Sequence, residues 1–117
     1  MANPNIVQVT SIYGKMAVQS ITTNATAIVT NSSGSNKVLK INALYVSNIE
    51  GETNEQVTVD VFRNSVAFHI ARTVVVPADA TLEVISKSIY LEEGDALRLT
   101  AGNNSRLQAV CSYEEIA

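Results

Sequence analysis

Short runs of alternating apolar and polar residues, separated by residues that favour turns, repeat along most of this chain. In the clearest run, residues 57–62, three valines alternate with Thr58, Asp60 and Phe62. Side chains of a β-strand point alternately to opposite faces, so this period of two predicts a strand with one buried face in an antiparallel sheet. Val, Ile and Thr account for 35 of the 117 residues, and these β-branched types favour strands. The chain is therefore predicted to be all-β.

Eight or nine strands are expected among ten such runs. The segments are residues 6–13, 16–21, 25–30, 37–48, 57–62, 66–76, 81–85, 89–91, 97–100 and 107–113. Turn-forming residues lie between them: a loop of Asn, Ser and Gly over 31–36, the Asn64-Ser65 pair of a hairpin, Pro77, and Gly94. The sequence shows no helical run of three turns, no internal repeat and no domain boundary. These features predict one antiparallel β-sandwich domain over residues 1–117, of the jelly-roll or Greek-key type.

Three details of this prediction are specific. Gly14 is expected to end the first strand, because glycine interrupts the run of β-formers there. In residues 37–48, the odd-numbered side chains are expected to point inward until Val46. The single cysteine, Cys111, excludes an internal disulfide, and its place in the alternating run 107–113 predicts a small buried hydrophobic residue on the face of Leu107 and Ala109.

Composition and charge argue against several classes of function. The net charge is −3 and the eight Lys and Arg residues are scattered, which argues against a nucleic-acid partner, although a fold that gathered four of them on one face would keep it open. No window approaches the roughly 20 apolar residues of a membrane span. The first residues contain no basic stretch followed by an apolar run, so no secretion signal is expected. The glycosylation-like triplets at Asn24, Asn31 and Asn103 are therefore interpreted as chance matches.

No residue is predicted to be catalytic, to bind a cofactor or to hold a metal ion. The single histidine, His69, lies within an apolar strand and is interpreted as structural, and no Gly-x-Ser-x-Gly motif supports a Ser-His-Asp triad around it. One His and one Cys do not supply a zinc site without carboxylates. The acidic turn of Glu92, Glu93 and Asp95 has two interpretations: a solvated turn that guards a strand edge, which we favour, or a Ca²⁺ site.

The aromatic residues leave one ligand-binding alternative open. The chain has four Tyr, two Phe and no Trp, whereas stacking platforms depend on several exposed rings. A glycan or cell-surface ligand site would require Tyr13, Tyr45 or Tyr90 to gather at the surface beside acidic side chains. If these rings are buried, that alternative fails.

The distribution of charge indicates an interface near the start of the chain. Residues 1–49 carry only Lys15, Lys37 and Lys40 as charged residues, and every acidic residue lies from Glu50 onward. An open sandwich exposes unpaired strands at its edges, and symmetry-related copies can cover them. We therefore expect a homo-oligomer in which residues 1–21 form an interface strand or arm.

Several segments resemble small structural proteins of tailed-phage virions, especially those of marine phages that infect cyanobacteria. The segments are residues 74–87, 89–101 and 107–116, together with the start Met1-Ala2-Asn3-Pro4 and residues 40–48. The resemblance extends over most of the chain. Its pattern of a proline, small residues, a strand and an acidic glycine turn also suits other sandwiches.

The resemblance implies a non-enzymatic component present in many copies on a virus particle, and no catalytic residues carry over from the group. The leading expectation is a capsid decoration or cement protein that contacts itself and other virion proteins. The alternative is a neck, tail or fibre sandwich that binds a glycan or cell-surface ligand. The expected location is the virion, after assembly in the host cytoplasm.

Overall fold

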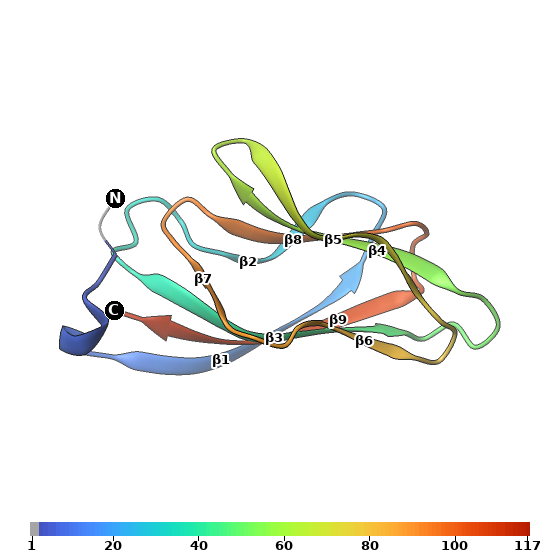
Figure 1. The fold of residues 1–117 in the computed structure, drawn as a ribbon, viewed down its shortest axis with the longest axis horizontal. Helices are drawn as coiled ribbons and strands as arrows, with labels where there is room; N and C mark the ends of the chain where they lie inside the picture. The colour runs from blue at the N-terminus through green and yellow to red at the C-terminus, as the bar shows by residue number, and fades with distance from the viewer. Residues whose placement is uncertain (1–2) are drawn as a thin grey trace.

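The computed structural model describes residues 3–117 as two packed layers of strands (Figure 1). A short 3-10 helix, η1 (Ile6–Gln8), precedes nine strands in this part of the chain. The strands are β1 (Ile12–Ile21), β2 (Thr26–Thr30), β3 (Val38–Asn48), β4 (Glu55–Arg63), β5 (Val66–Val76), β6 (Thr81–Ile85), β7 (Ile89–Leu91), β8 (Ala96–Ala101) and β9 (Leu107–Ile116). The all-β prediction is confirmed. Met1 and Ala2, which belong to the predicted arm and to the phage-like start, lie outside the described residues.

Both sheets are antiparallel, and each takes strands from both halves of the chain. Sheet A has the order β1-β9-β3-β6, with β7 also pairing β3, and sheet B has the order β2-β8-β4-β5. β6 and β7 pair with different parts of β3 and together occupy the place of one strand. The neighbours β1–β9, β2–β8, β3–β6/β7 and β4–β5 are those of one long hairpin rolled across two sheets, which is the jelly-roll arrangement. The β-sandwich prediction is therefore confirmed.

The core lies between the sheets and is built from the residues that the alternation predicts. Val57 and Val59 of β4 are at most 1% exposed, and so are Leu107, Ala109 and Cys111 of β9 in the facing sheet. Burying a Val or Leu side chain contributes about 1.5–3 kcal/mol relative to exposure. The prediction for the last strand is confirmed, and these contacts hold the two sheets together.

The β4–β5 hairpin also forms as predicted. Asn64 and Ser65 both have positive φ angles, 51° and 62°, as two-residue turns with the twist of the flanking strands require. β5 then ends at Val76, directly before Pro77. The tip of this hairpin projects beyond the neighbouring strands in Figure 1.

The first predicted strand is wrong in its position. Residues 6–8 form η1, and β1 passes straight through Gly14, where the pattern predicts a break. Gly14 lies opposite Glu114 in an unshifted ladder with β9. That ladder outweighs the weak local preference of glycine for turns, so the predicted runs 6–13 and 16–21 give way to one edge strand.

The inward face of β3 also differs from the prediction. Ile41 is buried as expected, but the register with β9 shifts between Ile41 and Ala43, and beyond the shift Leu44 and Val46 are buried instead. A β-bulge adds one residue to a strand and so reverses the parity that faces the core. Here Asn42 is the added residue, and the switch comes earlier than the sequence pattern predicts.

Residues 3–11 cross one end of sheet A. Asn3 Nδ2 donates a hydrogen bond of 2.5 Å to Glu92 Oε1, just after β7, and the Ser11 amide donates one of 3.1 Å to the carbonyl of Ala117, just after β9. Since β3 and β9 lie between β7 and β1 in the sheet order, the segment passes the ends of these two central strands. The described part of the predicted arm is therefore folded back on its own sheet up to the start of β1.

Candidate functional site

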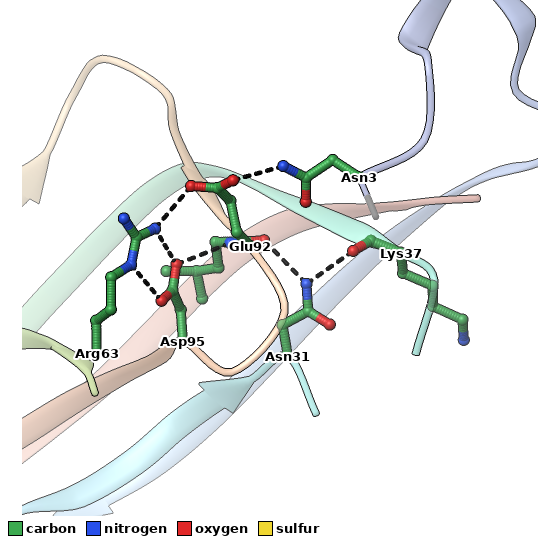
Figure 2. Close-up of polar contacts among 7 residues, drawn as sticks. Asn3, Asn31, Lys37, Arg63, Glu92 and Asp95 are labelled. Carbon is green, nitrogen blue, oxygen red and sulfur yellow. Dashed lines mark hydrogen bonds and ion pairs between the residues drawn. The ribbon is translucent and has the colours of Figure 1, made fainter. Parts of the chain in front are cut away.

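The acidic turn between β7 and β8 is held by an arginine from the end of β4 (Figure 2). Arg63 Nε donates to Asp95 Oδ1 at 2.6 Å, and its Nη2 donates to Asp95 Oδ2 at 2.5 Å and to Glu92 Oε2 at 2.9 Å. Asp95 also accepts the Glu92 amide at 2.8 Å. Burial alone would raise the pKa of Asp95, but the hydrogen bonds from Arg63 and from the Glu92 amide outweigh it and hold that pKa below its usual value. The arrangement is a structural clamp between β4 and the turn.

The third carboxylate of the turn, Glu93, points into the protein. It is 3% exposed and accepts the backbone amides of Gly34 and Asn36 at 2.7 and 3.2 Å. The buried Asn31 side chain donates to the carbonyls of Lys37 and of the last residue of β7 at 2.9 and 3.0 Å, as Figure 2 shows. These bonds join the acidic turn to the loop between β2 and β3.

These contacts favour a structural acidic turn over a Ca²⁺ site. The carboxylates of Glu92 and Asp95 converge on the Arg63 guanidinium, which supplies the positive charge between them, and Glu93 points away to backbone amides, whereas a calcium site needs carboxylates to converge on the metal ion. Within residues 3–117, no group of three or more His, Cys, Asp or Glu side chains is placed to hold a metal ion. The turn is not solvated as expected, however, because Glu93 and Asp95 are buried.

His69 is exposed on β5, opposite Asp60 of β4. The carboxylate of Asp60 already accepts Arg98 Nε at 2.9 Å, and the Arg98 guanidinium lies 3.9 Å from the centre of the Phe62 ring. Within the described residues, the His69 side chain makes no hydrogen bond, and four shallow hollows found on the surface are lined by other residues. This environment gives no support to a triad around His69.

Cys111 lies in the middle of β9 with no exposed surface. Burial raises the pKa of its thiol to about 11, so very little of the nucleophilic thiolate forms at neutral pH. The prediction of a small buried hydrophobic residue is confirmed.

Most of the basic side chains are neutralised by acidic partners. Five of the eight form ion pairs: Lys15, Lys37, Arg63, Arg98 and Arg106. Lys15 and Lys37 share Glu115 at 3.0 and 2.6 Å, and hydrogen bonds from Lys37 and Lys15 lower the pKa of that carboxyl. A phosphate backbone needs unneutralised cations, so these pairs argue against a nucleic-acid surface. No helix within residues 3–117 is long and apolar enough to cross a membrane.

The tyrosines named above are exposed but do not form one cluster. Tyr13, Tyr45 and Tyr90 are 59%, 40% and 46% exposed. Tyr45 of β3 lies opposite Glu83 of β6 on the outer face of sheet A. Tyr90 of β7 lies on the same face, opposite Lys40 of β3. Tyr13 lies opposite Glu115 on the other face. Both Tyr13 and Tyr45 therefore lie beside an acidic side chain, but Glu115 is held by two lysines, which leaves the Tyr45–Glu83 pair as the better arrangement for a glycan site.

The outer face of sheet A carries a row of exposed apolar side chains. Val18 of β1 lies opposite Val110 of β9, which lies opposite Tyr45 of β3, and Met16 is on the same face of β1. Met16 and Val18 are 67% and 69% exposed. A shallow hollow of about 310 Å³ lies beside Val18 and Val110. We call Met16, Val18, Tyr45 and Val110 the outer patch, and contiguous exposed apolar surface of this kind marks interaction sites.

Sequence reasoning missed the outer patch. The alternation that buries Leu107, Ala109 and Cys111 also predicts that Val110 faces outward, so one member could have been found. Met16 and Val18 belong to the patch only because β1 pairs with β9. These two strands are far apart in the sequence, so no local pattern shows that they pair.

Comparison with known proteins gives a fold relationship. No protein-family model matches the chain, and no curated protein sequence matches it. A similar solved structure comes from Bacillus endospore appendages, which form a family of disulfide-linked pili. The alignment covers 100% of this chain and 96% of that one, with a TM-score of 0.55 and 13% sequence identity. At this identity the similarity concerns the fold alone.

Proposed function

We propose that this chain is a non-enzymatic structural protein of a tailed-phage virion, present in many copies, which decorates or cements the capsid surface through contacts with itself and with other virion proteins. The outer patch is the observation that carries the proposal. It is an exposed apolar row on a broad sheet face rather than a pocket, and such a surface suits protein–protein contact.

The chemistry of the described residues agrees with this role. His69 lacks a poised partner, Cys111 is buried and protonated, and the acidic turn holds the fold together. All buried polar side-chain atoms in the described residues have hydrogen-bond partners, so the interior carries no unpaired group that would await a ligand.

The pilus of the Bacillus appendages supports the multi-copy part of the proposal, since a similar fold occurs there in a pilus. The disulfide linkage of those pili does not carry over. The chain has one cysteine, and it is buried. Copies of this chain would therefore associate through non-covalent contacts.

Mass spectrometry of purified particles tests the proposal. We expect the chain to be present in many copies per particle, and gold-labelled antibodies against it to mark the head. Labelling of the neck or tail would contradict capsid decoration and favour an attachment role. Absence of the chain from the particles would contradict the proposal as a whole.

The alternative is a glycan site on a neck, tail or fibre protein, and the exposed Tyr45–Glu83 pair is the observation that favours it. A glycan array with the purified chain tests this alternative. Binding that Tyr45→Ala abolishes, and that Tyr90→Ala leaves intact, would favour it over decoration. An array without binding would count against it.

A further inference from the structure

We propose that β1 is a pairing edge at which two copies of this chain join their sheets A about a two-fold axis. The proposal rests on the multi-copy role and specifies the partner, a second copy, and the strand that it meets. It starts from the backbone: within residues 3–117, β1 pairs on one side only, with β9, so the outward N–H and C=O groups on its other side have no strand partner.

The other three sheet edges carry protection that β1 lacks. Short strands, bulges, charges and prolines protect an edge against pairing. β2 has five residues and a register shift, and the edge shared by β6 and β7 is interrupted between two short strands. β5 is long, but its ladder with β4 shifts twice, and Thr73 has a φ of 46°. β1 instead has ten residues in an unshifted ladder with Lys15 as its single charge.

The side chains of β1 are apolar on both faces of the strand. Ile12, Met16 and Val18 point to the outer face and Tyr13 to the other, and all four are at least 54% exposed. A partner strand with the same sequence therefore meets apolar groups with apolar groups. Since the other long edge is bulged, the matching surface for β1 is β1 itself, which makes the contact isologous.

Lys15 disfavours one register. Its ammonium group pairs with Glu115 of the same copy at 3.0 Å, and an antiparallel pair centred on Lys15 would crowd two such ion pairs against each other. A pair centred on Ala17 places Lys15 opposite Gln19 of the second copy and Met16 opposite Val18. In this register Tyr13 also lies opposite Ile21, so Tyr13, Met16 and Val18 each oppose an apolar residue, while Ile12 falls opposite Thr22, just beyond β1.

The contact combines backbone pairing with partial cover of apolar side chains. Four side chains of this size, each more than half exposed, present on the order of 500 Å² per copy. Side chains of a strand project from the faces of its sheet, so edge pairing covers their flanks and buries a part of this surface, while the backbone hydrogen bonds of the paired strands supply the remainder of the contact. The sheet of the dimer is continuous, and the two outer patches lie side by side across its centre.

Sedimentation equilibrium of the purified chain tests the pairing. We expect a dimer at micromolar concentration, and we expect Val18→Lys to raise the dissociation constant at least 100-fold by placing a charge within the contact in both copies. Val75→Lys is the matched control, because Val75 is 48% exposed on β5, away from this edge, and this variant should dimerise like the wild type. Thermal unfolding of both variants verifies that they are folded.

Cross-linking tests the register. With Ala17 at the centre, residue 16 of one copy lies opposite residue 18 of the other, at a Cα separation that a disulfide spans. The double variant Met16→Cys/Val18→Cys should give a covalent dimer on oxidation, and Met16→Cys alone should not. A chain that stays monomeric to millimolar concentration, or a Val18→Lys variant that dimerises like the wild type, overturns the pairing. Cross-linking by Met16→Cys alone overturns the register.

Failure of this inference is distinguishable from failure of the proposed function. A monomeric chain that is still found in many copies on purified particles overturns the β1 pairing and leaves the virion role standing. A dimer that is absent from particles leaves the pairing standing and overturns the virion role.

Discussion

Replacing Arg63 by methionine should destabilise the fold markedly, although the side chain lies at the surface. Methionine keeps the aliphatic bulk and removes the guanidinium that makes three hydrogen bonds to Asp95 and Glu92. Asp95 is 1% exposed, so the substitution leaves a buried carboxylate whose remaining described bond comes from the Glu92 amide.

The cost can be worked from the geometry. Hydrogen bonds to charged groups contribute about 1.5–3 kcal/mol each, and two of the three reach the buried carboxylate. The Arg63 side chain is 43% exposed, so solvent screens it and water replaces part of the loss. We expect a net decrease of about 2 kcal/mol in the free energy of unfolding, which lowers Tm by about 8 °C for a domain of this size.

Thermal unfolding measured against pH gives the sharpest test. Because the pKa of Asp95 is lowered in the folded state, its ionic stabilisation is fully present above the unfolded value of about 3.9 and is lost as the pH falls through the folded pKa. The Tm difference between wild type and Arg63→Met should therefore shrink below about pH 4. Arg72→Met is the control, since Arg72 makes no ion pair with the described residues and should cost little. Equal Tm values at pH 7, or a difference that persists at pH 2, would refute the clamp.

Three further outcomes follow from the buried residues. Leu99→Ala, at a position with no exposed surface, should lower the free energy of unfolding by about 3 kcal/mol in urea titration, and a loss under 1 kcal/mol would mean that the site is not packed as described. Asn48→Ala should cost about 2 kcal/mol in the same assay, because the buried amide donates to the carbonyls of Thr53 and Val76, and an unchanged midpoint would argue against these bonds. The Cys111 thiol, with a pKa of about 11, should react with an aromatic disulfide reagent at pH 8 only after denaturation, and rapid reaction of the native protein would contradict its burial.

The sequence predicts most of the strands because local alternation is enough to mark them. Val57 and Val59 are buried where the period of two places them, and the turn of Asn64 and Ser65 forms because its residues tolerate positive φ. The errors occur where pairing with a strand far away in the sequence decides the local structure. Gly14 stays inside β1 because β9 pairs with the strand on both sides of it. The bulge at Asn42 reverses the buried face of β3, and the sequence does not show where, because apolar residues occupy both odd and even positions of this strand.

The candidate site was less accessible to sequence reasoning for the same reason. The acidic turn is visible as a motif, but its partner Arg63 lies 29 to 32 residues away, and no local pattern connects them. The outer patch depends on a strand order that places the first strand beside the last. What the sequence does show is the low charge before Glu50, and this is the stretch that contains the exposed edge strand.

The most direct test of assembly through β1 is amide hydrogen exchange measured over a range of protein concentrations. In the single copy, the N–H groups of β1 that point away from β9 have no described strand partner and should exchange rapidly. As the concentration rises through the dimer dissociation constant, these amides should become protected, while the edge amides of β2 and β6 remain unchanged. Exchange of β1 that stays rapid at every concentration, or protection that arises at another edge, would contradict the account.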